Sequence, residues 1–97
     1  MSDSLGKQGK KIAILAKLAR RTKIGMDYLP KEKVLGRIPK HARGDISTVL
    51  DEMYREGLIE YHKGKKCISI NPNSVEKVTR MLEGEIPDYI LDKLGYH

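Results

Sequence analysis

The sequence contains no phenylalanine, no tryptophan, one cysteine and no long apolar run. The single cysteine, Cys67, cannot form an internal disulfide, and with three histidines it falls short of the ligand sets that hold structural zinc. No segment approaches the roughly 18 consecutive apolar residues of a membrane span, and the N-terminal residues lack the apolar core of a signal peptide. We therefore expect a protein of the reducing cytoplasm, without a metal site or a membrane-spanning helix.

Acidic residues are scarce in the first part of the chain. Residues 1–40 hold 11 lysines and arginines against 3 aspartates and glutamates, whereas residues 67–97 hold 3 against 5, and the formal net charge is +6. Clustered cations attract polyanions such as nucleic acid more strongly than an evenly charged surface does. Charge alone leaves open an ordinary lysine-rich surface.

The residue patterns that catalysis requires are also missing. Ser47 and Thr48 have no identifiable histidine partner, and the dispersed glycines do not form a phosphate-binding loop. A domain of this size offers little room for a substrate pocket. We expect no enzyme activity, no cofactor and no small-molecule effector.

The N-terminal half of this one-domain chain shows two helical segments. Residues 1–8 are expected to be a flexible basic tail, and apolar residues at helical spacing predict a first helix over residues 9–22. Pro30 suits the start of a short second helix that runs through Leu35. The glycine-broken segment 23–29 is either a loop or a short third strand. The basic residues of the first helix are expected largely on its outer side: Lys10, Lys11, Lys17, Arg20 and Arg21.

The apolar period changes in the middle of the chain. A helix is predicted over residues 41–56, with Asp45 as a candidate N-cap and Gly57 as its stop. Alternating apolar residues then predict two strands joined by the basic, glycine-containing turn 62–66, which makes a hairpin with a cationic tip. The residues that define the apolar face of the helix are Ile46, Val49, Leu50, Met53 and Tyr54.

The C-terminal part predicts two further helices. Asn73 and Glu76 have the spacing of a capping box that opens a fourth helix, and a last apolar cluster follows Pro87. That cluster is too short to be stable alone and needs a surface to cover it. Residues 72–97 are therefore expected to be a helical extension that either completes the monomer core or forms a dimer interface.

The run from Asp45 to Asn71, DISTVLDEMYREGLIEYHKGKKCISIN, resembles the recognition helix and wing of winged helix-turn-helix regulators, such as the multiple-antibiotic-resistance and arsenical-resistance types. The resemblance implies an α+β, mainly α domain over residues 9–71, with a three-helix core and a β-hairpin wing, followed by C-terminal helices. The residues in the matching places are Ile46, Leu50, Met53, Gly57, Leu58 and Ile59.

The resemblance also implies how such a domain would bind double-stranded DNA: the recognition helix reads the major groove, and the wing contacts phosphates or a minor groove. We expect sequence-specific binding by a transcription regulator that acts as a homodimer, because two-fold symmetry lets two modest half-sites add their contacts. By position, the recognition-helix residues are Arg43, Gly44, Asp45, Ser47 and Thr48, the wing residues are Lys63, Gly64, Lys65 and Lys66, and Lys40 and His41 would contact the DNA backbone.

Two other functions stay open on the sequence. Asp45, Asp51 and Glu52 place negative charge on or beside the reading face, which favours a protein-interaction module in a larger assembly that docks through this helix. The basic first helix and tail instead favour binding to structured RNA. His62 and Cys67 could approach each other across the hairpin, but without further ligands nearby they are expected to be sheet residues and not a metal site.

Overall fold

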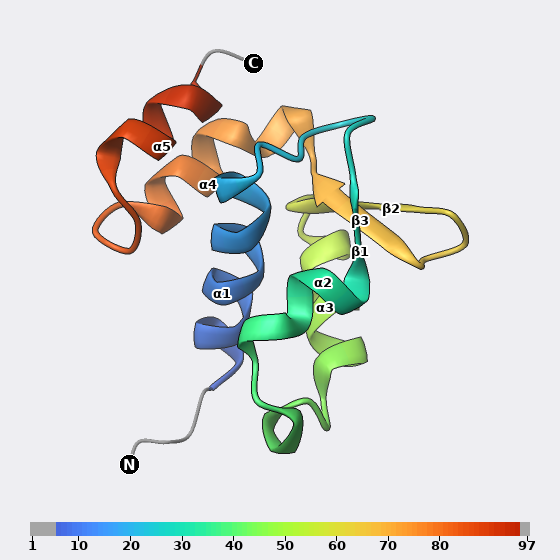
Figure 1. The fold of residues 1–97 in the computed structure, drawn as a ribbon. Helices are drawn as coiled ribbons and strands as arrows, with labels where there is room; N and C mark the ends of the chain where they lie inside the picture. The colour runs from blue at the N-terminus through green and yellow to red at the C-terminus, as the bar shows by residue number, and fades with distance from the viewer. Residues whose placement is uncertain (1–5, 96–97) are drawn as a thin grey trace.

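The computed structural model describes residues 6–95, which form a small α+β domain with a three-stranded antiparallel sheet (Figure 1). The predicted mainly helical α+β class is therefore confirmed. The helices are α1 (Lys7–Arg20), α2 (Lys31–Val34), α3 (Ile46–Arg55), α4 (Val75–Leu82) and α5 (Asp88–Leu94), the 3-10 turns are η1 (Leu35–Arg37), η2 (Lys40–Ala42) and η3 (Pro72–Ser74), and the strands are β1 (Leu29–Pro30), β2 (Ile59–His62) and β3 (Cys67–Ile70).

Strand β3 lies in the middle of the sheet, with β1 on one side and β2 on the other. The hairpin β2–β3 pairs Ile59 with Ile70 and His62 with Cys67, as its alternating apolar residues predicted. On the other edge Leu29 pairs with Ile68, so the segment 23–29 supplies one residue of a two-residue strand. The other is Pro30, which precedes α2 and is not its first residue as predicted. Such a short edge strand gives no periodic signal in the sequence.

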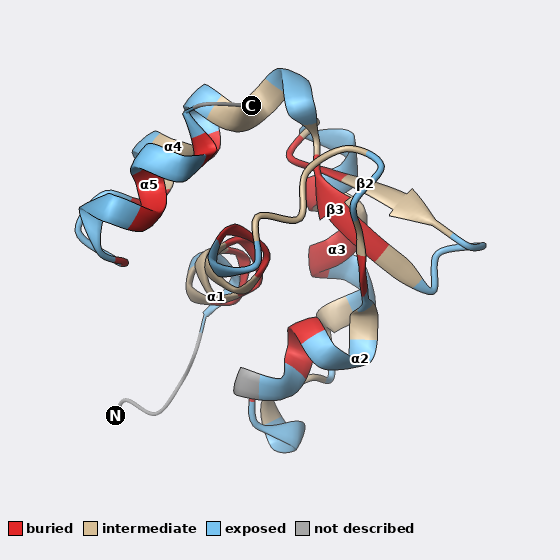
Figure 2. Ribbon diagram, turned by 45° about the horizontal axis from the view of Figure 1, so that its top comes forward, coloured by how far each residue is buried: buried red, intermediate tan, exposed pale blue. Residues whose placement is uncertain are grey.

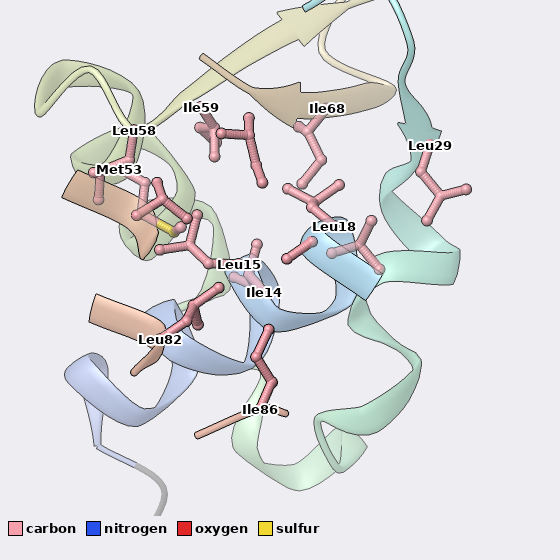
Figure 3. Close-up of a cluster of buried hydrophobic side chains, with 14 of the residues drawn as sticks. Ile14, Leu15, Leu18, Leu29, Met53, Leu58, Ile59, Ile68, Leu82 and Ile86 are labelled. Carbon is pink, nitrogen blue, oxygen red and sulfur yellow. The ribbon is translucent and has the colours of Figure 1, made fainter. Parts of the chain in front are cut away.

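Helix α1 runs through the centre of the molecule. Figure 2 shows it end-on, with α3 and the sheet on one side and α4 and α5 on the other. Its residues Ile14, Leu15 and Leu18 are fully buried and meet side chains from both sides, including Met53 and Leu82 (Figure 3). Because these side chains touch both halves of the core, α1 joins them. Truncating one of these side chains to alanine typically costs about 2–5 kcal/mol of stability.

The C-terminal extension packs on this helix. Its apolar residues Val78, Leu82, Leu91 and Leu94 are buried within the chain and belong to the same core cluster. The extension therefore completes the monomer core, the first of the two expected roles. The apolar surface on which a dimer interface over residues 72–97 rested is largely used inside one chain.

The start and the basic side of α1 differ from expectation. The helix begins at Lys7, because the Lys10 N–H already bonds to the Gly6 carbonyl, so residues 7 and 8 are helical rather than tail. The rest of the expected tail, residues 1–5, lies outside the described residues. Lys10 and Lys11, predicted on the outer side, are only 7% and 9% exposed. They lie against α3, whose acidic residues they bind.

Helix α3 starts at Ile46, as the Asp45 N-cap predicted, and not at residue 41, because residues 40–42 form the separate turn η2. Tyr54 was predicted on its apolar face but is 54% exposed. At roughly 100° per residue, Tyr54 lies about 100° around the helix from Met53, which is fully buried. The sequence pattern therefore made the apolar face too wide.

Asp45 takes its predicted N-cap position, but neither predicted capping hydrogen bond forms among the described residues. The Asn73 N–H donates to the Asn71 side chain at 2.9 Å within η3, and Ser74, not Asn73, precedes α4. Glu76 instead pairs with Arg80 one turn later. In both places a tertiary contact or a short 3-10 turn displaces the local capping pattern.

Candidate nucleic-acid interface

The exposed side of α3 lies next to a cationic hairpin tip, which we define as residues 63–66. Ser47 and Thr48, near the start of α3, are exposed. Most of the other predicted contact residues are exposed as well: Lys40, His41 and Gly44 before α3, and Lys63, Gly64, Lys65 and Lys66 at the hairpin tip. Arg43 and Asp45 are half-buried, and their side chains bind other parts of the chain.

Arg43 holds together the long connection between α2 and α3. Its Nε donates to the Ile38 carbonyl at 2.9 Å, and its Nη2 donates to the Leu35 carbonyl at 2.8 Å. Leu35 and Ile38 are themselves buried, so this bent segment has both apolar anchors and a guanidinium crosslink. Two of the donors of Arg43 therefore serve the backbone, and its predicted base contact stays a prediction.

Asp45 binds α1 instead of the backbone or a base. Lys10 Nζ donates to Asp45 Oδ1 at 2.5 Å, and the contact joins residues 35 positions apart. This hydrogen bond holds the pKa of Asp45 below its ordinary value. The sequence left two roles open for this carboxylate, a helix cap and a contact with cytosine. In the structure its hydrogen-bond partner is instead Lys10.

The other acidic residues on this side of α3 are also paired with α1. Lys7 Nζ donates to Glu52 at 2.8 Å, and Lys11 Nζ donates to Glu56 at 3.1 Å and lies 3.5 Å from Glu52. The Lys7 hydrogen bond lowers the pKa of Glu52, and the same bond raises the pKa of Lys7. The α1 lysines therefore neutralise one side of α3, and we call these contacts the α1–α3 ion pairs.

Asp51 is the acidic residue on the other side of α3, toward the hairpin. Tyr61 Oη donates to Asp51 Oδ1 at 2.6 Å, and Lys65 Nζ lies 4.0 Å from the same oxygen. The Tyr61 bond lowers the pKa of Asp51, and the positive charges of Lys65, Arg55 and Lys31 lower it further. Burial first, and then this bond, raises the pKa of Tyr61. The carboxylate thus stays ionised within a ring of cations.

Aromatic rings support this cluster. The Tyr54 and Tyr61 ring centroids are 5.1 Å apart, and Lys65 Nζ lies 5.2 Å from the Tyr61 ring centroid. A cation over an aromatic face contributes about 0.5–1 kcal/mol at an exposed site. The base of the hairpin tip is therefore packed against the C-terminal half of α3, and the two form one continuous surface.

The hairpin tip itself has an unusual backbone. Lys63, Gly64 and Lys65 all adopt positive φ angles, of 56°, 63° and 71°. Glycine adopts this region freely, whereas a lysine there costs about 1–2 kcal/mol. The turn therefore places two exposed lysines in a backbone conformation that glycine or asparagine would adopt at lower cost.

Sequence reasoning missed three residues of this surface: Lys31, Tyr54 and Arg55. The Lys31 N–H donates to the Lys66 carbonyl at 2.9 Å, which fixes the start of α2 against the hairpin. Only folding brings this residue to the site, so no local signal could have found it. Tyr54 and Arg55 lie on the exposed side of α3. A narrower predicted apolar face would have placed both residues on the candidate surface.

His62 and Cys67 face each other across the hairpin, as expected, since they are register partners. His62 Nε2 bonds to Ser69 Oγ at 3.0 Å, Ser69 in turn donates to the Gly25 carbonyl, and the His62 ring stacks on Tyr28. These contacts give His62 a structural role in the sheet. Among residues 6–95, no group of three or more His, Cys, Asp or Glu side chains is placed to hold a metal ion.

A groove of about 500 Å³ runs along a different face of α1. Its lining combines apolar side chains with charges of both signs. The residues that line it are Gln8, Gly9, Ile12, Ala13, Ala16, Lys17, Arg20, Glu85 and Ile86. None of them belongs to the exposed side of α3 or to the hairpin tip, so the groove is a separate surface.

None of the helices within residues 6–95 combines the length and the apolar character that crossing a bilayer requires. Comparison with protein-family models, with curated proteins and with solved structures found no match. The surface formed by α3 and the hairpin tip is the candidate functional site.

Proposed function

We propose that this chain is a winged-helix protein that binds double-stranded DNA in a sequence-specific manner and regulates transcription in the cytoplasm. The element order α1–β1–α2–α3–β2–β3, with a hairpin directly after α3, supports the winged-helix arrangement that the sequence resemblance implies. In this proposal α3 is the recognition helix and the hairpin tip is the wing.

The observation that carries the proposal is the continuous surface from Ser47 and Thr48 to the three lysines of the hairpin tip. An α-helix fits the major groove of B-DNA, and short polar side chains on its exposed face can reach base edges. Exposed lysines beside it suit phosphates, which fix the position of the protein on the duplex. Arg43 is occupied, so base contacts fall to residues of α3 itself.

The α1–α3 ion pairs weaken both alternatives. A protein-docking role rested on the acidic residues of α3, but Asp45, Glu52 and Glu56 already have lysine partners within the chain. An RNA-binding role rested on the basic first helix, but Lys10 and Lys11 are nearly buried in those same pairs. The lysines of the hairpin tip remain exposed, and DNA binding is the function that we propose for them.

We retain the homodimer as part of the proposal and assign it to the α1 groove, which Glu85 and Ile86 of the C-terminal extension also line. The groove combines apolar lining residues with Lys17, Arg20 and Glu85, so a second copy can pair opposite charges across a two-fold axis. Light scattering at increasing concentration should show a dimer that Ala13→Glu converts to a monomer. A wild-type monomer at all concentrations would remove the homodimer from the proposal.

A fluorescence titration against a mixed-sequence DNA duplex at several salt concentrations tests DNA binding. The variant K63Q/K65Q/K66Q should bind about 10–100-fold more weakly, and its salt slope should fall by about 3, because each phosphate contact contributes about 0.9 to the slope. The matched control, K77Q/R80Q/K93Q, removes the same charge from exposed positions on α4 and α5. Equal losses in both variants, or no binding at low salt, would overturn the proposal.

A further inference from the structure

Asp51 stands where a base-reading residue would stand. It lies one turn beyond Ser47 and Thr48 on α3, and residues three and four apart share one face of a helix. Its side chain is 42% exposed. The acidic residues on the other side of α3 are paired with α1, whereas Asp51 lies on the side that continues into the hairpin tip.

The orientation of this carboxylate is fixed by its neighbours. Tyr61 donates to Oδ1 at 2.6 Å, and the Tyr61 ring is held in turn by Tyr54 and Lys65. Within the described part of the chain, the hydrogen bond and the ion pair of Asp51 both use Oδ1. The lone pairs of Oδ2 are therefore available to a donor from outside. A side chain held by packing and a supporting hydrogen bond can discriminate between donors more sharply than a mobile one.

The cations around Asp51 remove the main objection to an acidic residue at a DNA surface. A lone carboxylate near phosphates would weaken binding, but Lys65 Nζ lies 4.0 Å from this one, and the positive charges of Lys65, Arg55 and Lys31 lower its pKa. These cations can meet the phosphates on either side. The carboxylate between them can then face the groove floor instead of the DNA backbone.

The chemistry of the major groove selects the matching base. A carboxylate only accepts hydrogen bonds, and the donors in the major groove are the N4 amine of cytosine and the N6 amine of adenine. In adenine the acceptor N7 lies beside the amine and repels a carboxylate, whereas cytosine has a nonpolar C5–H in the neighbouring position. Resting on the proposed function, we propose that Asp51 reads a cytosine in the major groove through its N4 amine and that Tyr61 positions Asp51 for this contact.

Selection from a pool of duplexes with a randomised centre tests this proposal, using the full chain. The wild type should enrich a cytosine at one position of the selected site. Asp51→Asn should reduce the preference for that cytosine by about tenfold or more, and it should bind mixed-sequence duplex more tightly because a negative charge is lost. Tyr61→Phe should weaken the cytosine preference more than it weakens mixed-sequence affinity.

The control is Glu60→Gln, which makes the same change of charge on β2. Successive residues of a strand point to opposite faces, so Glu60 points away from the face of Tyr61. This variant should keep the cytosine preference. An undiminished preference in Asp51→Asn, or a wild type that binds mixed duplex without any base preference, would overturn the reading role while leaving DNA binding intact. Failure to bind mixed duplex at all would instead remove the proposed function.

Discussion

Two sets of three lysines carry much of the positive charge of this domain, and the fold uses them differently. Lys7, Lys10 and Lys11 of α1 bind acidic residues of α3, and two of them are almost fully buried. The lysines of the hairpin tip are exposed, and the single ion pair among their described contacts joins Lys65 to Asp51 at 4.0 Å. The three lysines of α1 thus stabilise the fold through ion pairs, whereas the three lysines of the hairpin tip remain exposed.

Helix α3 shows the same division between its two sides. The side toward α1 carries Asp45, Glu52 and Glu56, each bound to a lysine. The side toward the hairpin carries Ser47, Thr48 and Asp51, followed by the aromatic Tyr54 and the cationic Arg55. A helix can therefore contain several acidic residues and still offer a surface suited to DNA, provided that the fold neutralises the acids on the other side.

The largest expected effect is a loss of stability on replacing Arg43, whose side chain binds the backbone. Arg43→Met should lower the free energy of unfolding by about 2–3 kcal/mol, because two carbonyls lose a charged donor. Urea denaturation measures this loss. The folded variant should keep its affinity for mixed-sequence duplex, whereas Arg55→Met should bind more weakly with unfolding free energy within about 0.5 kcal/mol of wild type. A larger binding loss in Arg43→Met than in Arg55→Met would restore Arg43 to the interface.

Replacing the two positive-φ lysines of the hairpin tip should raise the stability of the fold and weaken DNA binding. Asparagine tolerates positive φ better than lysine does, so K63N/K65N should raise the free energy of unfolding by up to about 1 kcal/mol. Mixed-sequence affinity should fall several-fold at the same time. Lys66→Asn is the control, because Lys66 is not among the residues with positive φ. It should weaken binding without stabilising the fold, and a similar gain in stability would refute the strain argument.

Removing an α1 cation should affect the fold and not the interface. Lys11→Gln leaves Glu52 and Glu56 with one fewer partner, so the thermal unfolding midpoint should drop by a few degrees. The salt slope of DNA binding should stay at the wild-type value. A shallower slope would mean that α1 also contacts phosphates, and the contrast between the two sets of lysines would disappear.

The smallest expected effect is a dependence of stability on pH. Asp45, Asp51 and Glu52 have lowered pKa values because Lys10, Tyr61 and Lys7 donate hydrogen bonds to them. Carboxyls with a lower pKa in the folded state stabilise it above their unfolded pKa, and that stability is lost as pH falls through the folded value. The unfolding midpoint should therefore be flat above about pH 5 and decrease below it. The decrease should be modest because these groups are exposed, and D45N/E52Q should flatten it further.

Part of this architecture follows from local patterns in the sequence. The buried residues Val49, Leu50 and Met53 recur at helical spacing, and the hairpin register follows from alternation around a glycine-containing turn. These signals arise because one face of each element must be buried, and the burial pattern repeats with the period of the backbone. The exposed lysines at the hairpin tip were predictable for the same reason.

The sequence by itself therefore determined the main helices, the hairpin and its cationic tip. Tertiary structure alone decided which charges are used within the fold. The ion pairs Lys10–Asp45 and Lys11–Glu56 join residues 35 and 45 positions apart, and Lys31 reaches the hairpin through a strand of two residues. A side chain binds whichever partner the packed chain brings within reach, and for Arg43, Asp45 and Asp51 that partner lies on another element or across a long connection.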